Sequence, residues 1–431
     1  MRRVLNLTVL IAALGYFVDM FDITVFGVVR IPSLKALGVV DPGQLMQTGM
    51  LLLNLQACGM LVGGLLWGVI GDKKGRLSVL FGSIFIYSVA NILNAFVTSV
   101  PSYAVLRFCA GVGLAGELGA AVTLVSELLS KEDRGYGTAI IAALGLLGAV
   151  TASLVGQLAS WKVAYLLGGT MGVGLLLARF KMADSEMFQK SAAGARRGDL
   201  RLLFSAERFR RYLFCILVGI PIYFTTGILF SFAPELAREM GLTGVTAGNA
   251  LLFGSIGLTI GDLLSGLLSQ WLKSRRKAVL FSFFVGFVFA TLYFRSGTAS
   301  VVQFYAICGG LGLAAGYWAV LVTIAAEQFG TNLRATVATS VPNFVRSSVI
   351  ILTLTFTAFR TQVGFLNLAI GLGMTVFAIA LFSLSRLRET YGRDLDFSEI
   401  DEPLRHQVSI KDLPLLEPNG AGVLISPHPT E

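Results

Sequence analysis

A series of long apolar segments constrains this chain more than any other feature. Each is roughly 20 residues long or longer, which is the length of apolar helix that crosses a bilayer. Charged residues make up only 14% of the chain, against about 25% in an ordinary soluble protein. The sequence therefore predicts an all-α membrane protein with twelve transmembrane helices. The apolar segments lie at about residues 8–32, 45–70, 77–98, 102–129, 136–158, 161–181, 212–237, 245–272, 277–296, 300–328, 335–359 and 363–385.

A polar, basic stretch at residues 182–211 divides these segments six and six. We expect residues 1–181 and 212–385 to form two six-helix bundles, with 182–211 as the cytoplasmic linker. Residues 386–431 are spaced with prolines and show little apolar periodicity, which predicts a disordered cytoplasmic tail.

The chain carries a formal net charge of +9. The positions of its Lys and Arg residues indicate the reason for this excess. If the N-terminus is cytoplasmic, the inside loops collect Lys73, Lys74 and the bases at 275–277, whereas the outside loops keep few. Lys and Arg resist translocation, so this asymmetry predicts that both termini are cytoplasmic. It gives no reason to expect a nucleic-acid partner. The cysteines fall in apolar segments without paired spacing, which predicts packing residues rather than disulfides or a metal site.

The two halves resemble each other at an offset close to 200 residues. Glu127 precedes Arg134 by seven positions, and Glu327 precedes Arg334 by the same interval. Gly-Leu-Ala-Gly at 113–116 likewise corresponds to Gly-Leu-Ala-Ala-Gly at 312–316. These matches predict an internal duplication, and transporters built from two such halves place the substrate site between them.

The loop after the second segment reads Gly-Val-Ile-Gly-Asp-Lys-Lys-Gly-Arg at 68–76. This loop resembles the signature of the major facilitator superfamily. The segments 327–336 and 388–393 are similar to motifs of its sugar-porter and metabolite-symporter branches. The resemblance implies two pseudo-symmetric six-helix bundles and transport by alternating access. It also implies a cytoplasmic gate made by Asp72, Arg76, Glu127, Arg134, Glu327 and Arg334.

Transport by this chain needs an energy source other than ATP, because no phosphate-binding loop of the form Gly-x-x-x-x-Gly-Lys-Ser/Thr is present. An ion gradient is the alternative. The only histidines, His406 and His428, lie in the tail, so carboxylates must carry a proton. No nucleophile with a base and no cofactor motif is visible, which argues against an enzyme.

Ionisable residues within apolar segments cost free energy to insert into the membrane. We therefore expect each of them to have a function or a charged partner. Asp19 and Asp22 are three apart, on one face of the first helix. At 1.5 Å per residue, Asp22 lies roughly 18 Å above the cytoplasmic end and Arg107 roughly 22 Å. The two are therefore expected to meet, as a proton-coupling site or as a static ion pair. Asp19 and Glu117 are further candidates for coupling, and Glu117 either lines the cavity or bonds a neighbouring helix.

In the second half, Arg346 and Asp262 lie at compatible depths. Either they pair with each other, or Arg346 holds a substrate carboxylate by two parallel hydrogen bonds. The segment 221–227 lacks the pair of glutamines that binds sugars in sugar porters, so a sugar substrate is disfavoured. Further candidates for contact with substrate are Tyr223, Phe224, Tyr317 and Trp318, with Asn54, Gln56 and Asn343 as weaker ones.

Together these features predict a proton-coupled symporter of a small organic acid. We expect a monomer, surrounded by lipid, in a bacterial inner or plasma membrane. The alternative is a transporter of organic cations or drugs, because four buried acids outnumber two buried arginines. A transporter-like nutrient receptor, which binds its ligand without moving it, is the alternative of another class.

Overall fold

The computed structural model describes residues 7–74, 76–117, 119, 134–183 and 205–392. Those residues form helices and loops and contain no strand. Nine of the described helices are long and apolar enough to cross a membrane, and three more at 78–94, 100–114 and 144–158 are apolar but shorter. Their positions match the twelve apolar segments. The twelve-helix membrane fold predicted from the sequence is therefore confirmed.

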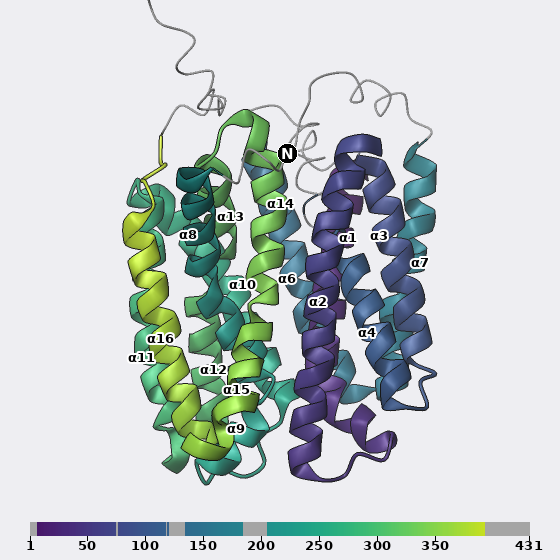
Figure 1. Cartoon of the computed structure of the whole chain (residues 1–431), viewed down its shortest axis with the longest axis vertical. Coiled ribbons are helices and arrows are strands. Elements are labelled where there is room, and N and C mark those ends of the chain that lie inside the picture. Colours follow the sequence, from purple (N-terminus) through teal and green to yellow (C-terminus); the bar gives the residue numbers. More distant parts are fainter. Residues whose placement is uncertain (1–6, 75, 118, 120–133, 184–204, 393–431) are drawn as a thin grey trace, which may run out of the picture.

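The helices of the first half lie side by side in Figure 1, coloured purple to blue. Ser99 is the N-cap of α4, and its side chain accepts a hydrogen bond from the Ser102 amide. Pro101 lies in the first turn, where its missing amide hydrogen leaves no hydrogen bond unmade. The elements are α1 (Leu7–Ala36), α2 (Pro42–Lys74), α3 (Arg76–Asn94), α4 (Val100–Leu114), α6 (Arg134–Leu158) and α7 (Trp161–Ala183).

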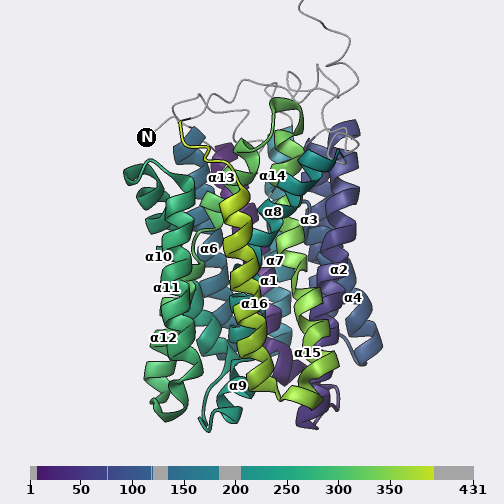
Figure 2. The same cartoon turned by 60° about the vertical axis from the view of Figure 1, so that its left-hand side comes forward.

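The second half lies beside the first and contains shorter elements (Figures 1 and 2). α14 contacts α2, and α10 contacts α6, so these helices form much of the junction between the halves. The elements are α8 (Ala206–Tyr223), the π-helix η3 (Phe224–Phe230), α9 (Ala233–Glu239), α10 (Ala247–Trp271), α11 (Arg275–Phe294), the 3₁₀ helix η4 (Ser296–Thr298), α12 (Val301–Ala315), α13 (Trp318–Glu327), α14 (Thr331–Ser347), α15 (Val349–Val363) and α16 (Phe365–Arg386).

Three of the predicted segments are interrupted, which corrects the expectation of continuous helices. α8 gives way to a π-helix after Tyr223, α12 and α13 are separated at Gly316 and Tyr317, and α14 and α15 at Ser348. Pro221 lies just before the first break, where a missing amide loosens the helical ladder. α8 also begins inside the stretch assigned to the linker. The remainder of that linker, 184–204, and the tail from 393 lie outside the described residues.

Glycines bring two pairs of helices into close contact at equivalent positions of the halves. A Cβ added to Gly59 of α2 would meet the Phe108 carbonyl of α4. A Cβ added to Gly257 of α10 would meet the Gly309 carbonyl of α12 in the same way. Small residues permit such approach of helix backbones in membranes. The duplication suggested by the sequence thus recurs as a repeated helix crossing.

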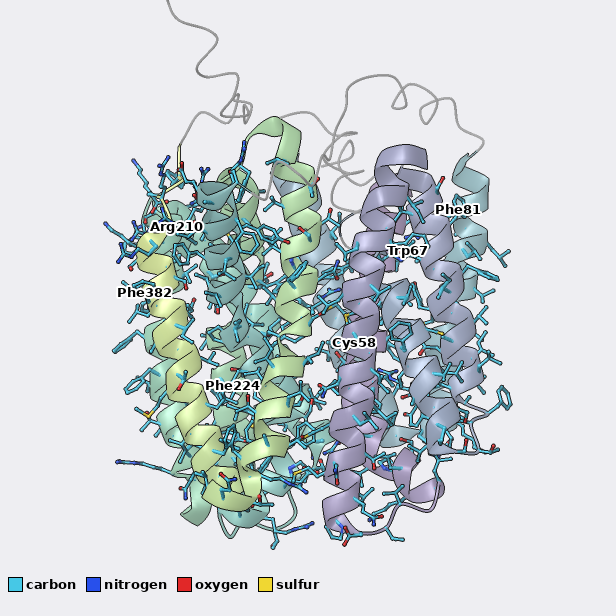
Figure 3. All side chains as sticks on the ribbon, viewed as in Figure 1. Cys58, Trp67, Phe81, Arg210, Phe224 and Phe382 are labelled. Carbon is cyan, nitrogen blue, oxygen red and sulfur yellow. The ribbon has the colours of Figure 1, made fainter. Side chains whose placement is uncertain are left out.

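Large apolar side chains cover the outer surface of the bundle. Phe382 projects outward from α16 in Figure 3, whereas Phe224 lies among the helices. Their exposed fractions are 52% and 0%. An outward apolar surface of this kind is stable against lipid and not against water. The chain is an integral membrane protein.

Candidate functional site

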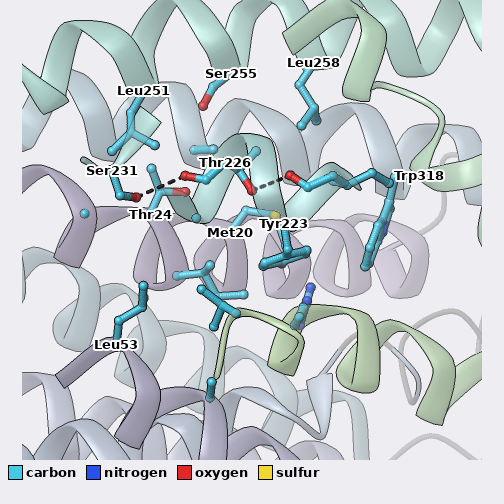
Figure 4. A pocket seen from close by; sticks show the side chains of 18 of the residues that line it. Met20, Thr24, Leu53, Tyr223, Thr226, Ser231, Leu251, Ser255, Leu258 and Trp318 are labelled. Carbon is cyan, nitrogen blue, oxygen red and sulfur yellow. Dashed lines mark hydrogen bonds between the residues drawn. The ribbon is translucent and has the colours of Figure 1, made fainter. Parts of the chain in front are cut away.

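A cavity of about 120 Å³ lies between the two halves. A single water needs about 10–15 Å³ on this scale, so the cavity has room for a small molecule. Figure 4 shows the rings of Tyr223 and Trp318 at one end and Thr24 and Ser231 at the other. The lining comes from both halves and comprises Tyr16, Met20, Ile23, Thr24, Gly27, Leu53, Gln56, Ala57, Met60, Leu146, Ala149, Ile222, Tyr223, Thr226, Gly227, Ser231, Leu251, Ser255, Leu258, Trp318, Arg346 and Val349.

Most of the cavity wall is apolar, and two of its hydroxyls are already satisfied. Thr226 Oγ1 donates to the Ile222 carbonyl at 2.9 Å, and Ser231 Oγ donates to the Thr226 carbonyl at 3.0 Å (Figure 4). A mostly apolar wall with a few placed polar groups is typical of small-molecule sites. The chemistry of the site therefore depends on its few charged groups.

Arg346 is the cation in the cavity wall. Its Nη2 atom donates a hydrogen bond of 3.1 Å to Oδ2 of Asp19, and both side chains are fully enclosed. Within the described part of the chain, Nε and Nη1 of Arg346 and Oδ1 of Asp19 have no hydrogen-bond partner. The guanidinium also lies over Trp318, with Cζ 5.8 Å from the ring centroid. The cavity thus presents a guanidinium with free donors beside an aromatic ring.

Arg346 and Asp262 do not pair, which was one of the two arrangements expected for them. Oδ1 of Asp262 instead accepts a hydrogen bond of 2.8 Å from the backbone amide of Ala319, in the first turn of α13. Free amides at a helix N-terminus suit a carboxylate, and the break before Trp318 creates that N-terminus. The sequence argument sought a partner only in the second half, whereas the actual partner, Asp19, comes from α1 of the first half.

The predicted aromatic residues fall into two groups. Tyr223 and Trp318 line the cavity, with ring centroids 6.1 Å apart. Phe224 and Tyr317 do not line it. Phe224 packs against Gly373 of α16, and the Tyr317 hydroxyl donates to the Val218 carbonyl at 2.9 Å. Phe224 and Tyr317 are therefore packing residues.

Asn343 also lies outside the cavity lining. Its side-chain amide donates to the Ala115 carbonyl of the first half at 3.0 Å and to the Thr339 carbonyl of its own helix at 3.2 Å. Asn54 and Gln56 were predicted in the same group as Asn343. Asn54 accepts a hydrogen bond from Thr353 of α15, and Gln56 lines the cavity. Asn343 and Asn54 thus join the two halves.

Asp22 and Arg107 do not form the expected ion pair. Arg107 Nη2 donates to Oε1 of Gln56, and its guanidinium lies 4.5 Å from the ring centroid of Phe26. In the described residues neither carboxylate oxygen of Asp22 has a hydrogen-bond partner. Asp22 lies against Gly168 of α7, away from the cavity lining. The depths of Asp22 and Arg107 along their helices do not show that α2 brings Gln56 to the arginine.

Glu117 bonds a neighbouring helix, one of the two arrangements expected for it. Arg179 of α7 forms an ion pair with both of its carboxylate oxygens. The two side chains are 0% and 4% exposed, and a Cβ on Gly15 of α1 would collide with both. The pair therefore packs against α1 one turn before Asp19. Arg179 was not singled out from the sequence because it stands near the end of the apolar segment 161–181, next to the basic stretch taken for the linker.

One residue of the predicted cytoplasmic gate has a described side chain. Glu327 accepts from Arg275 at 3.5 Å and from the Thr390 hydroxyl at 2.6 Å. These contacts join α13 to α11 and to the segment after α16. Glu127 lies outside the described residues, as do the side chains of Asp72, Arg76, Arg134 and Arg334.

Glu389 belongs to the same end of the second half. It accepts hydrogen bonds from the Ser274 hydroxyl and from the backbone amides of Arg275 and Arg276, at the start of α11. Partial burial raises its pKa, but these hydrogen bonds and that from the Tyr391 amide outweigh burial, so the pKa lies below the ordinary value. Glu389 thus stabilises the N-terminus of α11 as a carboxylate.

A second ion pair joins the halves at the other end of α1. Nη2 of Arg30 donates to Glu235 of α9 at 2.7 Å and to the Ser231 carbonyl at 3.0 Å. Arg30 is 1% exposed and lies 4.3 Å from the ring centroid of Phe232. Arg30 lies within α1, which extends to Ala36.

Other lining residues share one face of α1. The three- and four-residue spacing of a helix face joins Tyr16, Met20, Ile23, Thr24 and Gly27. That spacing is visible in the sequence, but apolar residues occur on every side of this helix and conceal it. The described residues contain no cluster of three or more His, Cys, Asp or Glu able to hold a metal ion.

Comparison with known proteins places this architecture among transporters. The family model described as Major Facilitator Superfamily matches residues 12–354. The chain is 26% identical over 336 residues to a putative niacin/nicotinamide transporter of Bacillus subtilis (strain 168), covering 76% of this chain and 81% of that protein. It is 24% identical over 378 residues to a 4-hydroxybenzoate transporter of Acinetobacter baylyi, covering 77% and 79%.

A benzoate transport protein of the same Acinetobacter strain is 22% identical over 372 residues, covering 76% of this chain and 78% of that protein. Among solved structures, a crystal structure of a D-xylose–proton symporter superposes with a TM-score of 0.66 at 14% sequence identity. That superposition covers 90% of this chain and 99% of the symporter, and at such identity it shows the fold alone.

Proposed function

The chain belongs to the Major Facilitator Superfamily, and from that premise we propose that it is a proton-coupled symporter of a small aromatic carboxylic acid. It is thus a transporter and not an enzyme. We further propose that it works by alternating access as a monomer in a bacterial inner membrane, with both termini in the cytoplasm. Residues 1–181 and 212–385 would be the two moving bodies.

The observation that carries the proposal is the guanidinium of Arg346, which has hydrogen-bond donors without a partner in the described residues. It is enclosed, it lines the cavity, and two of its nitrogens have no partner within the described residues. Arginine offers a planar fork of donors that matches a carboxylate. Trp318 and Tyr223 supply the flat apolar surface that an aromatic ring packs against.

The relatives support the same substrate class. Their names refer to niacin or nicotinamide, benzoate and 4-hydroxybenzoate. All of these have one six-membered aromatic ring, and all except nicotinamide have one carboxylate. A cavity that offers one guanidinium beside the rings of Tyr223 and Trp318 fits this shape and charge. An organic cation would instead have to lie against Arg346, which disfavours that alternative.

Proton coupling is supported by the buried carboxylates of α1. Asp19 and Asp22 are 0% and 1% exposed. An enclosed carboxylate that is ionised without a partner is costly in free energy, so its protonation depends on the charges around it. We place the coupling proton on this pair, with Arg107 and the Glu117–Arg179 pair as the surrounding charges.

Uptake by proteoliposomes tests the proposal. With an acidic outside, proteoliposomes should accumulate radiolabelled benzoate or nicotinate faster than protein-free liposomes, which the uncharged acids enter unaided. A protonophore should abolish that accumulation. The permanently charged cation tetraethylammonium is the control for the cation alternative. Accumulation of that cation without either acid would refute the proposal, and binding of benzoate without any flux would favour a receptor.

A further inference from the structure

We infer that the carboxylate of Asp19 is a built-in competitor of the substrate carboxylate for Arg346, and that each bound substrate requires one proton on Asp19. The inference rests on the proposed function and deepens it. It names which of the two α1 carboxylates is linked to substrate and why the two ligands must bind together.

The first step is the geometry of the guanidinium. A carboxylate that takes two parallel hydrogen bonds from arginine uses Nη2 together with either Nε or Nη1. Nη2 of Arg346 is the atom that Asp19 holds, whereas Nε and Nη1 have no partner among the described residues. Nη2 carries two hydrogens, and Asp19 accepts from one of them. A substrate carboxylate held by two hydrogen bonds would therefore share Nη2 with Asp19, which places two carboxylates on one guanidinium.

The second step is the charge of the enclosed site. Arg346 and Asp19 together are neutral, and so are Glu117 and Arg179. A substrate anion bound to Arg346 would leave Asp19 as an enclosed carboxylate without a counter-charge, which is costly in a low-dielectric site. A proton on Asp19 forms an O–H bond, removes the excess charge and releases Nη2. The guanidinium keeps its own protons throughout.

The other titratable groups near Asp19 do not supply this counter-charge. Those that face it from its own helix and from the packed helices are carboxyls or phenols, with two exceptions. Arg179 is engaged by Glu117, and Arg107 lies on the side of Asp22 and donates to Gln56. Asp22 on α1 and Asp262 on α10 add negative charge, and Asp262 is already held by the α13 amide of Ala319. The remaining neighbours are the phenols of Tyr16, Tyr87 and Tyr223.

Position separates Asp19 from Asp22. Asp19 contacts a cavity-lining residue directly. Asp22 points to Gly168 of α7 and has no hydrogen bond to any lining residue in the described chain. Entry of a carboxylate into the cavity thus alters the partner of Asp19 and leaves the contacts of Asp22 in place.

Proton uptake on binding gives a direct test. Benzoate is titrated into the purified full-length protein in weakly buffered detergent solution containing a pH-indicator dye, with benzamide as the uncharged analogue. Wild type should take up about one proton per benzoate, and once Asp19 is ionised the affinity should fall about tenfold for each further pH unit. Benzamide should cause no uptake.

Asp19→Asn should bind benzoate with no proton uptake and with an affinity independent of pH, tighter than wild type in alkaline solution. Asp41→Asn, the same change at the exposed start of α2, is the control for handling and should match wild type. If Asp19→Asn does not fold, Asp19→Glu serves instead, because it keeps a titrating carboxyl and should move the midpoint of the pH profile.

Three outcomes overturn the inference. Unchanged proton uptake in Asp19→Asn is one, and an unmoved midpoint in Asp19→Glu is another. Loss of uptake in Asp22→Asn with retention in Asp19→Asn would assign the proton to Asp22. None of these outcomes touches the accumulation of benzoate by wild type in proteoliposomes, so the proposed function stands as long as that accumulation is observed. A wild type that neither binds nor transports benzoate or nicotinate refutes the proposed function, and the inference with it.

Discussion

Arg346 is the residue on which recognition of a carboxylate depends, and its fork of donors matters as much as its charge. Replacing it with lysine keeps the positive charge opposite Asp19 but removes the parallel donors. Losing one charge-assisted hydrogen bond costs about 1.5–3 kcal/mol. We therefore expect Arg346→Lys to weaken benzoate binding by about 10- to 100-fold, measured by calorimetry at the pH where wild type binds best.

The matched control is Arg238→Lys, an exposed position in the last turn of α9. It should bind benzoate as wild type does. An equal affinity in Arg346→Lys and Arg238→Lys would mean that a point charge suffices, and it would remove the reason for assigning a carboxylate to this nitrogen fork.

Glu389 makes a pH-dependent contribution to stability that can be measured apart from transport. Its folded-state pKa is lowered, so its contribution is present above the unfolded value of about 4.3 and is lost as the pH falls through the folded value. Glu389→Gln should lower the free energy of unfolding by about 0.3–1 kcal/mol at neutral pH, as for a charge at a helix N-terminus.

Thermal unfolding in detergent at several pH values checks this contribution. The difference between Glu389→Gln and wild type should be constant above about pH 5, vanish well below pH 4, and shrink at high salt because the side chain is exposed. A difference that persists at low pH would show that the carboxylate charge is not the source of the stabilisation.

At the scale of elements, the cavity is built where helices of the second half are interrupted. Tyr223 is the last residue of α8 before the π-helix, Trp318 begins α13, and Arg346 lies next to the last residue of α14. Discontinuous helices place backbone ends and side chains at the substrate site of many transporters, and π-turns cluster at functional sites. The breaks therefore position the three side chains that we assign to substrate.

Apolar periodicity was sufficient to predict the number of membrane helices but not these breaks. An interrupted helix and a continuous one have the same hydropathy, and only Pro221 and Pro342 mark disturbed ladders in advance. Buried ionisable residues could likewise be identified as functional candidates, because charge in an apolar segment is conspicuous. The partners of these residues could not be identified from the sequence. The pairing of Arg346 with Asp19, for example, depends on how the two halves pack against each other.

The close crossing of α2 and α4 gives an element-scale prediction. A Cβ on Gly111 would overlap the Gln56 carbonyl, so a larger side chain must force the helices apart. We expect Gly111→Leu to cost about 1–3 kcal/mol of stability or more, measured as a lower unfolding midpoint in detergent. Gly174→Leu is the control, because nothing lies within 4 Å of a Cβ at Gly174. Equal midpoints for the two variants would contradict the close crossing.

For the whole molecule, the contacts between halves lie at both ends of the cavity. Asn343 with Ala115 joins the halves at one end, and Arg30 with Glu235 joins them at the other. Alternating access requires these contacts to break in turn. The Arg30 contact is the stronger electrostatically, since one guanidinium nitrogen holds both the Glu235 carboxylate and the Ser231 carbonyl.

We therefore expect Glu235→Gln to favour the conformation that opens the cavity at the Arg30 end. Its measure is the labelling rate of Ser255→Cys, a cavity position, in a chain whose native cysteines are replaced by serine. A membrane-impermeant maleimide is added from each side in turn. Loss of a pair worth about 1–2 kcal/mol changes a population about 5- to 30-fold, so labelling from the Arg30 side should rise by that factor.

Glu239→Gln is the matched control, because Glu239 lies on the same helix but bonds the Leu366 amide within its own half at 2.9 Å. It should leave the labelling rate unchanged, since that contact does not cross between the halves. If both variants accelerate labelling equally, local loosening of α9 is the cause. If neither does, Arg30 and Glu235 do not oppose opening, and the contact on the Asn343 side must set the resting conformation.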